Sequence, residues 1–105
     1  MISVTFTVSG NTLTGFHISG HSGYAEEGSD IVCAAVSSAS LMAANTITEI
    51  QKLDPAVSVN DGFLSLDLSQ EEAKAAEVTL SGLKLHLNAL SKEYPTFIKV
   101  AISEV

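Results

Sequence analysis

Two residue types that support nucleophilic chemistry occur near one another in the first third of the chain. Cys33 is the only cysteine, and His21 precedes it, directly after Gly20. In a Cys-His pair the imidazole assists formation of the thiolate and later protonates the leaving amine, as in thiol hydrolases. Sequence spacing does not show that the two side chains meet. A buried structural thiol and a surface histidine therefore remain the alternatives.

Cys33 stands at the start of a predicted helix. Apolar residues recur at three- and four-residue spacing from Val32 to Leu53, where a proline soon ends the pattern. With Asp30 as the N-cap, Cys33 is the third helical residue, where unpaired N–H groups and the helix dipole favour a thiolate. The backbone N–H groups of Cys33 and Ala34 are then candidates for an oxyanion hole.

Two polar neighbours are candidates for supporting this site. A helix cap accounts for Asp30 by itself, and in that role Asn would serve about equally well. The alternative is that the Asp30 carboxylate orients His21 or stabilises its imidazolium form. Ser37 lies one helical turn after Cys33 on the same face, although a hydroxyl there also suits a bond to the carbonyl one turn back.

The hydrophobic periodicity and the turn-forming residues predict the strands, loop and helix that position these residues. A period-two pattern over residues 2–8 and a second strand to about Ser19, with Gly15 as a bulge, predict a hairpin. Three glycines make residues 20–30 a predicted mobile loop, and the helix with Cys33 follows it.

The second half of the chain also has the pattern of a hairpin followed by a helix. Residues 60–62 are turn formers between apolar alternations and predict another hairpin, after which Ser69 and Glu72 form a capping box for a second amphipathic helix. A last strand is predicted over residues 97–103. The order β-β-α-β-β-α-β indicates an α+β fold, a mainly antiparallel sheet with both helices on one face, and we expect residues 1–105 to form a single domain.

Composition excludes several function classes. Twelve acidic residues against five lysines, with no arginine, give a formal net charge of -7, which argues against direct nucleic-acid binding. A 46% hydrophobic content excludes a disordered chain. The longest unbroken apolar run, residues 31–36, is too short for a membrane span, and the basic leader of a secretory signal is missing. We expect a cytoplasmic protein with no membrane association.

The other two histidines suggest no metal site. His17 stands on the predicted second strand, and His86 lies among leucines of the second helix. Neither they nor the single cysteine supply the ligand set that zinc requires. We therefore interpret both as structural or surface residues and predict neither a metal nor a cofactor.

The residues around the two reactive groups resemble a known family. The run Gly-His-Ser-Gly-Tyr-Ala at 20–25, followed by Gly-Ser-Asp-Ile-Val-Cys-Ala-Ala-Val-Ser at 28–37, closely resembles the signature of the ribosomal-processing cysteine protease family Prp. These small bacterial proteases remove a short N-terminal extension from a large-subunit ribosomal protein, number twenty-seven. The resemblance extends to the length and element order of nearly the whole chain.

This resemblance implies roles for individual residues. His21 matches the family's catalytic histidine, Cys33 its nucleophile, and Asp30 an acidic position beside the site. Ser22 stands where the family commonly has Ala, a change expected not to affect the chemistry. The resemblance also implies an apolar pocket beside Cys33 for an aromatic residue just before the cut. The loop expected to fold over the substrate contains Ser22, Gly23, Tyr24, Glu26, Glu27 and Gly28.

The implied partner is the N-terminally extended ribosomal protein, whose basic character would complement the acidic chain, and the family resemblance also implies a homodimer.

Two alternative functions belong to other functional classes. One is a non-catalytic acidic module that binds a basic ribosomal protein or an assembly factor and uses Cys33 only for packing. The other is a Cys-His hydrolase of a small thioester or amide.

Overall fold

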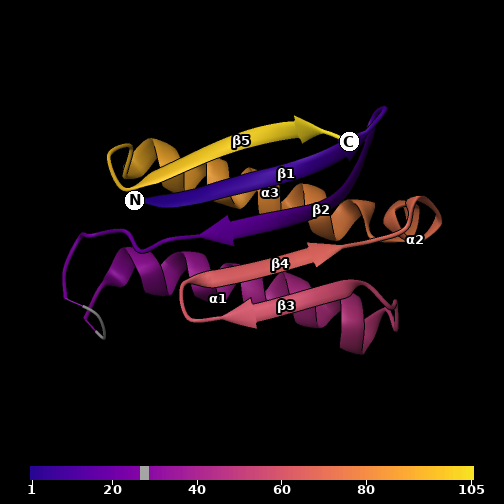
Figure 1. Ribbon diagram of the computed structural model, residues 1–105, viewed down its shortest axis with the longest axis horizontal. Helices are drawn as coiled ribbons and strands as arrows, with labels where there is room; N and C mark the ends of the chain where they lie inside the picture. The colour runs from indigo at the N-terminus through magenta and orange to yellow at the C-terminus, as the bar shows by residue number, and fades with distance from the viewer. Residues whose placement is uncertain (27–28) are drawn as a thin grey trace.

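A computed structural model describes residues 1–26 and 29–105. The strands are β1 (Ile2–Ser9), β2 (Thr12–Ser19), β3 (Ala56–Asn60), β4 (Phe63–Asp67) and β5 (Ile98–Glu104). They form one sheet in the order β3-β4-β2-β1-β5 (Figure 1). Only the β1–β5 pair is parallel, so the predicted mainly antiparallel sheet is confirmed.

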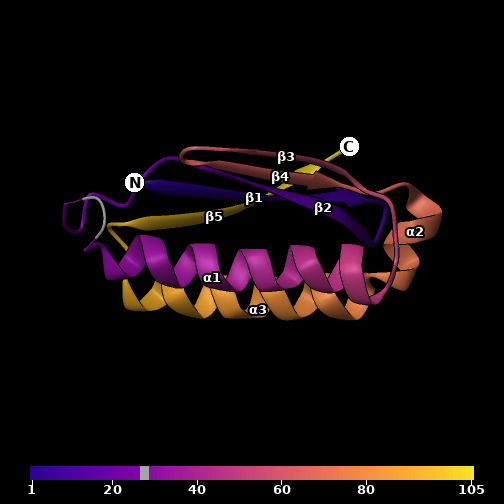
Figure 2. The ribbon, with the colours of Figure 1, turned by 90° about the horizontal axis from the view of Figure 1, so that it is seen from below.

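The helices are α1 (Ile31–Asn45), which continues into the π-helical segment η1 (Thr46–Ile50), α2 (Gln70–Ala75) and α3 (Glu77–Glu93). Figure 2 shows α1 and α3 side by side under one face of the sheet, as the sequence predicts. The core between the two layers is built from aliphatic residues and two phenylalanines, among them Val4, Phe6, Phe16, Val32, Ile47, Leu66, Leu80, Leu87 and Ile98.

The first hairpin explains where the sheet is irregular. Thr7 pairs with Gly15 and Val8 pairs with Leu13, so Thr14 is the extra residue of a β-bulge. The bulge therefore lies one residue before the predicted position. Gly15 has a different reason to be glycine, because a Cβ there would collide with the Leu66 carbonyl oxygen of the neighbouring strand.

The continuous helix from Ile31 to Ile50 is long and apolar enough, by length and composition alone, to cross a bilayer. In the structure one face of this helix belongs to the core, where Val32, Val36 and Ile47 are buried, while Leu41, Met42 and Ile50 are exposed. The sequence criterion of an unbroken apolar run does not detect it, because serines and threonines interrupt the pattern.

The predicted second helix is wrong in one respect, because it is broken at Ala76. Ala76 leaves the helical conformation (φ -94°, ψ 5°) while its carbonyl accepts from Leu80 N–H, so α3 starts in a new direction. The break lets α2 pack against the start of β2 while α3 runs along the sheet. Ser69 caps α2 by accepting from Glu72 N–H, which confirms half of the predicted capping box. The Glu72 carboxylate accepts from Asp54 N–H (2.9 Å), so the described residues do not show the reciprocal bond to Ser69.

Candidate active site

A cavity of about 600 Å³ opens between α1, the end of β2 and the β3–β4 turn. His21, Asp30, Cys33 and Ser37 all line it. The fold thus brings together the four residues that the sequence singled out, from a strand end, a loop end and a helix. Its apolar lining, which includes Ile2, Ile18, Val36 and Leu64, comes from the inner face of the sheet and from α1.

Asp30 is the N-cap of α1, and both of its carboxylate oxygens are used. Oδ1 accepts from the N–H groups of Val32 and Cys33, each at 2.9 Å. Oδ2 accepts from the Ser22 hydroxyl and from Ala25 N–H (3.3 Å). The buried carboxylate therefore ties the start of the helix to the glycine-rich loop.

These hydrogen bonds control the charge of Asp30. Burial by itself raises the pKa of the carboxyl group, but the bonds from Ser22, Cys33, Ala25 and Val32 outweigh burial and lower the pKa from 3.8 to about 2. Asp30 is ionised throughout the neutral range. Within the described residues none of its hydrogen bonds reaches His21.

Cys33 occupies the predicted third position of α1, and its side chain is partly exposed. Its Sγ accepts a hydrogen bond from Ser22 N–H at 3.2 Å. The loop therefore presents an N–H donor to the sulfur at the N-terminus of α1.

The oxyanion hole expected from the helix start is not available in this arrangement. Cys33 N–H donates to the Asp30 carboxylate, and Ala34 N–H donates to the Asp30 carbonyl at 3.1 Å. The same cap that positions Cys33 therefore uses both donors. Ser22 N–H donates to Cys33 Sγ instead of to a backbone carbonyl.

His21 is positioned by packing against the β3–β4 turn. A Cβ on Gly62 would lie 2.8 Å from His21 Nε2 and 3.3 Å from its Cε1, so the ring covers a surface that only glycine leaves free. Gly62 also adopts φ +68°, and its carbonyl accepts from Gly20 N–H (2.9 Å). Sequence reasoning identified the turn but missed this contact, because the two residues are distant in the chain.

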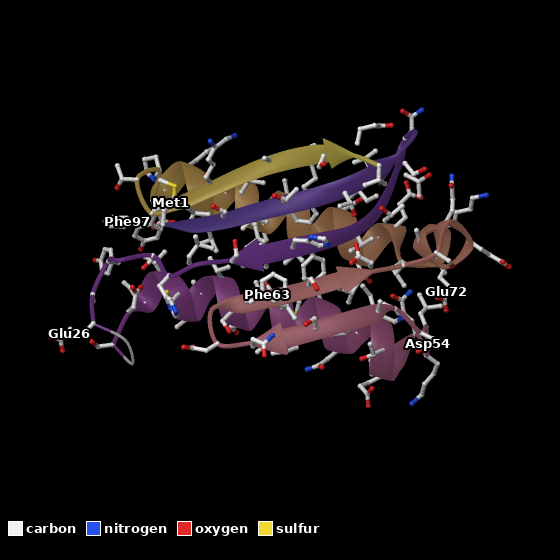
Figure 3. The ribbon with its side chains drawn as sticks, viewed as in Figure 1. Met1, Glu26, Asp54, Phe63, Glu72 and Phe97 are labelled. Atoms are coloured by element: carbon white, nitrogen blue, oxygen red, sulfur yellow. The ribbon has the colours of Figure 1, made fainter. Side chains whose placement is uncertain are left out.

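Tyr24 anchors the loop to the segment between α3 and β5. The Tyr24 ring packs edge-on against Phe97 and Tyr94, with centroids 5.3 and 5.9 Å away, and Tyr24 N–H donates to the Ser22 hydroxyl. Gly23 lines the cavity, whereas Glu26 is exposed near the outer end of the loop (Figure 3).

Two of the predicted loop positions, Glu27 and Gly28, lie outside the described residues. Ser22 is buried, so its hydroxyl acts within the loop through Asp30. The alanine that the family commonly has at this position could not donate this hydrogen bond, and the expectation that the serine does not affect the chemistry stays a prediction. The hydroxyl is one of the four donors that hold the Asp30 carboxylate.

The other histidines lie outside this cavity. His17 Nε2 contacts both carboxylate oxygens of Asp67, at 2.9 and 3.1 Å, across β2 and β4. His86 is exposed on α3. In the part of the chain that the structure describes, no three His, Cys, Asp or Glu side chains gather as a metal site would require.

A family model described as "Cysteine protease Prp" matches residues 1–99. This chain belongs to the Prp cysteine protease family. The sequence resemblance is thereby confirmed, and a cysteine protease is the enzyme class that the family defines. Membership in a protease family decides against the non-catalytic acidic module.

Related proteins are similar to this chain over most of its length. The ribosomal processing cysteine protease Prp of Bacillus subtilis is 24% identical over 91 residues, which is 81% of each chain. SMU.848 from Streptococcus mutans superposes with a TM-score of 0.86 at 27% identity over 100% of this chain and 96% of its own. The essential ribosomal processing protease Prp from S. aureus, solved with a covalently linked product peptide, gives a TM-score of 0.90 at 25% identity and covers 98% and 100% of the two chains.

Proposed function

We propose that this Prp family member is an endopeptidase that removes the N-terminal extension of large-subunit ribosomal protein number twenty-seven, with Cys33 as nucleophile and His21 as acid-base partner. The observation that carries the proposal is the shared cavity, in which His21 and a partly exposed Cys33 at a capped helix N-terminus both form the lining. The relatives' names, which specify ribosomal processing, support the substrate class.

The proposed reaction uses two steps. The Cys33 thiolate attacks the carbonyl carbon of the scissile bond, and the tetrahedral intermediate collapses to a thioester as His21 gives its proton to the leaving amine. A water molecule then attacks the thioester while His21 takes up its proton. The product leaves as a carboxylic acid that releases its remaining proton to solvent, and Cys33 returns as thiolate with His21 protonated. The covalently linked peptide in the S. aureus relative is consistent with a bond to the enzyme.

The charge of the chain suits this substrate. The net charge is -7, and Asp61 and Glu26 are exposed on the turn and the loop that flank the cavity. Ribosomal proteins are basic because they bind RNA. The negative electrostatic field of the enzyme therefore raises the rate at which the two proteins associate at low ionic strength. Ribosome assembly also places the proposed substrate in the cytoplasm, where we propose that the enzyme acts.

The decisive experiment is mass spectrometry after incubation of the extended ribosomal protein with wild-type enzyme or with Cys33→Ala. We expect a single N-terminal truncation with the wild type and none with the variant. The variant should keep its circular dichroism spectrum, because Ala replaces a small, partly exposed side chain. Truncation by both proteins would overturn Cys33 as nucleophile, and truncation by neither would overturn the substrate.

A further inference from the structure

Strand β3 forms one edge of the sheet beside the cavity. It is the last strand in the order β3-β4-β2-β1-β5, and all five of its residues are exposed (Figure 1). Neither proline nor a charged residue occurs from Ala56 to Asn60. Proline and charged residues commonly protect the edge strands of a sheet from pairing with another chain. β5, the opposite edge, carries Lys99 and Glu104. β3 is therefore an open template for another strand.

The register shows which backbone groups of β3 are open. Asn60 pairs with Phe63 across the two-residue turn, so these residues exchange the hydrogen bonds that close the hairpin. In an antiparallel ladder such pairs alternate, so Ser58 also bonds to β4, whereas Val57 and Val59 point their N–H and C=O groups away from β4. Among the described residues, these groups have no other backbone partner.

The open edge continues into the catalytic cavity. Val59 and Asn60 line the cavity that contains Cys33 and His21, and Leu41 and Ser37 of α1 form the facing wall. Val59 pairs with the inward-facing Leu64, so its side chain lies on the helix side of the sheet, where it is 61% exposed. Leu41 is 43% exposed. A peptide bound in the cavity would therefore contact these apolar side chains and lie beside the unpaired backbone groups of β3.

We propose that the substrate's extended segment next to the scissile bond binds as an additional strand on β3, paired with the outward N–H and C=O groups of Val57 and Val59. This inference rests on the proposed endopeptidase function and names how its substrate is held. Main-chain pairing supplies affinity for any extended sequence, while alternate substrate side chains face Val59 and Leu41 and supply an apolar preference.

The first test measures amide hydrogen exchange by NMR in Cys33→Ala, with a peptide that spans the junction of the extension as probe. We expect the Val57 and Val59 amides to exchange roughly tenfold or more slowly when the peptide is bound. The Ser58 amide is already paired and should not change, and neither should the amide of Ile102 on the opposite edge. This period-two response would not arise from binding elsewhere.

Each outcome of this test decides something. If the peptide binds without protecting the Val57 and Val59 amides, the inference is wrong. Cleavage of the extended protein by the wild type would in that case still support the proposed function. Protection without cleavage by the wild type supports the added strand and contradicts the proposed reaction. Protection already present without peptide, increasing with protein concentration, assigns the edge to a second copy of the chain and overturns the inference.

A second test uses proline on the two sheet edges. Val57→Pro removes an outward N–H without breaking the β3–β4 ladder, and we expect kcat/KM for the extended protein to fall about two- to tenfold relative to Val57→Ala. Alkylation of Cys33 by iodoacetamide should be unchanged, because the nucleophile is untouched. Ile102→Pro on β5 is the matched control, and an equal loss there would contradict pairing at β3.

Discussion

The two sides of the active site are held in place by different forces. On the Cys33 side, hydrogen bonds link Ser22, Asp30 and Cys33 into one network at the start of α1. On the histidine side, the ring of His21 packs against the backbone of Gly62. The first arrangement depends on the chemical type of each group. The second depends on volume, since it requires the absence of a side chain.

This difference teaches what kind of substitution each side tolerates. A hydrogen-bonded carboxylate with four donors is sensitive to exchange of an acceptor for a donor, even when the shape is kept. A ring seated on a glycine is sensitive to a single added methyl group, even when no polar atom changes. The following predictions separate the two sides.

The largest effect is expected from removing the imidazole. His21→Ala should lower kcat for cleavage about 100- to 10,000-fold, because general acid-base assistance is lost. His17→Ala and His86→Ala serve as controls that lie outside the cavity, and both should retain most of the activity. The measurement is the cleavage rate of the extended ribosomal protein by each purified variant. Similar losses in all three variants would contradict the assignment of His21.

The seat of His21 is tested by Gly62→Ala against Gly10→Ala. Both glycines have positive φ, +68° and +63°, but a Cβ on Gly10 meets nothing within 4 Å. Backbone strain should therefore lower the melting temperature of both variants similarly. Only Gly62→Ala should also lower kcat, about 10- to 100-fold, because it displaces the ring. Equal kcat values in the two variants would show that the contact does not position His21.

The network on the Cys33 side is tested by Asp30→Asn. The amide keeps one acceptor for Val32 and Cys33 but turns its NH₂ group toward Ala25 N–H, so one donor is left without a partner. We expect about a tenfold loss of cleavage and a melting temperature lowered by a few degrees, in contrast to the silent replacement that capping alone would allow.

Ser22→Ala is the matched control for this network. It removes one donor to Asp30 while leaving the N–H that faces Cys33 Sγ. The loss of cleavage and of melting temperature should be smaller than in Asp30→Asn. An Asp30→Asn enzyme with wild-type activity and stability would reduce Asp30 to an ordinary helix cap.

The smallest effect concerns stability in acid. The pKa of Asp30 is about 2 in the folded protein, below its ordinary value of 3.8, so the unfolded chain binds the proton more readily. The stabilising contribution is complete above about pH 4 and is lost as the pH falls toward 2. The melting temperature of the wild type should therefore approach that of Asp30→Asn over this interval. A constant difference between the two would contradict the lowered pKa.

Local patterns in the sequence predicted the parts of the site that depend on neighbouring residues. Asp30 as N-cap and Cys33 as third helical residue follow from the start of the apolar period, and the structure confirms both positions. The one-sided helices and the mainly antiparallel sheet follow from the order of the elements. The cap and the position of the thiol each depend on residues within a few positions of one another, whereas the layer arrangement follows from the order of whole elements.

Features that depend on distant contacts were not predictable in this way. The break at Ala76 has no local signal, because alanine is the best helix former. The contact of Gly62 with His21 depends on the pairing of β4 with β2. The engagement of Cys33 N–H by Asp30 is local, but a cap and an oxyanion hole compete for that donor, and only geometry shows which of them uses it.

The N-terminus of the described chain lies at the active-site end. Ile2 lines the cavity, Met1 packs its carbonyl against Gly20, and the C-terminus is at the far end of the sheet (Figure 1). A purification tag fused ahead of Met1 would begin beside the cavity at a tethered concentration of the order of millimolar. An apolar, extended tag would therefore raise the apparent KM for added substrate, whereas a tag after Val105 would begin at the far end of the sheet.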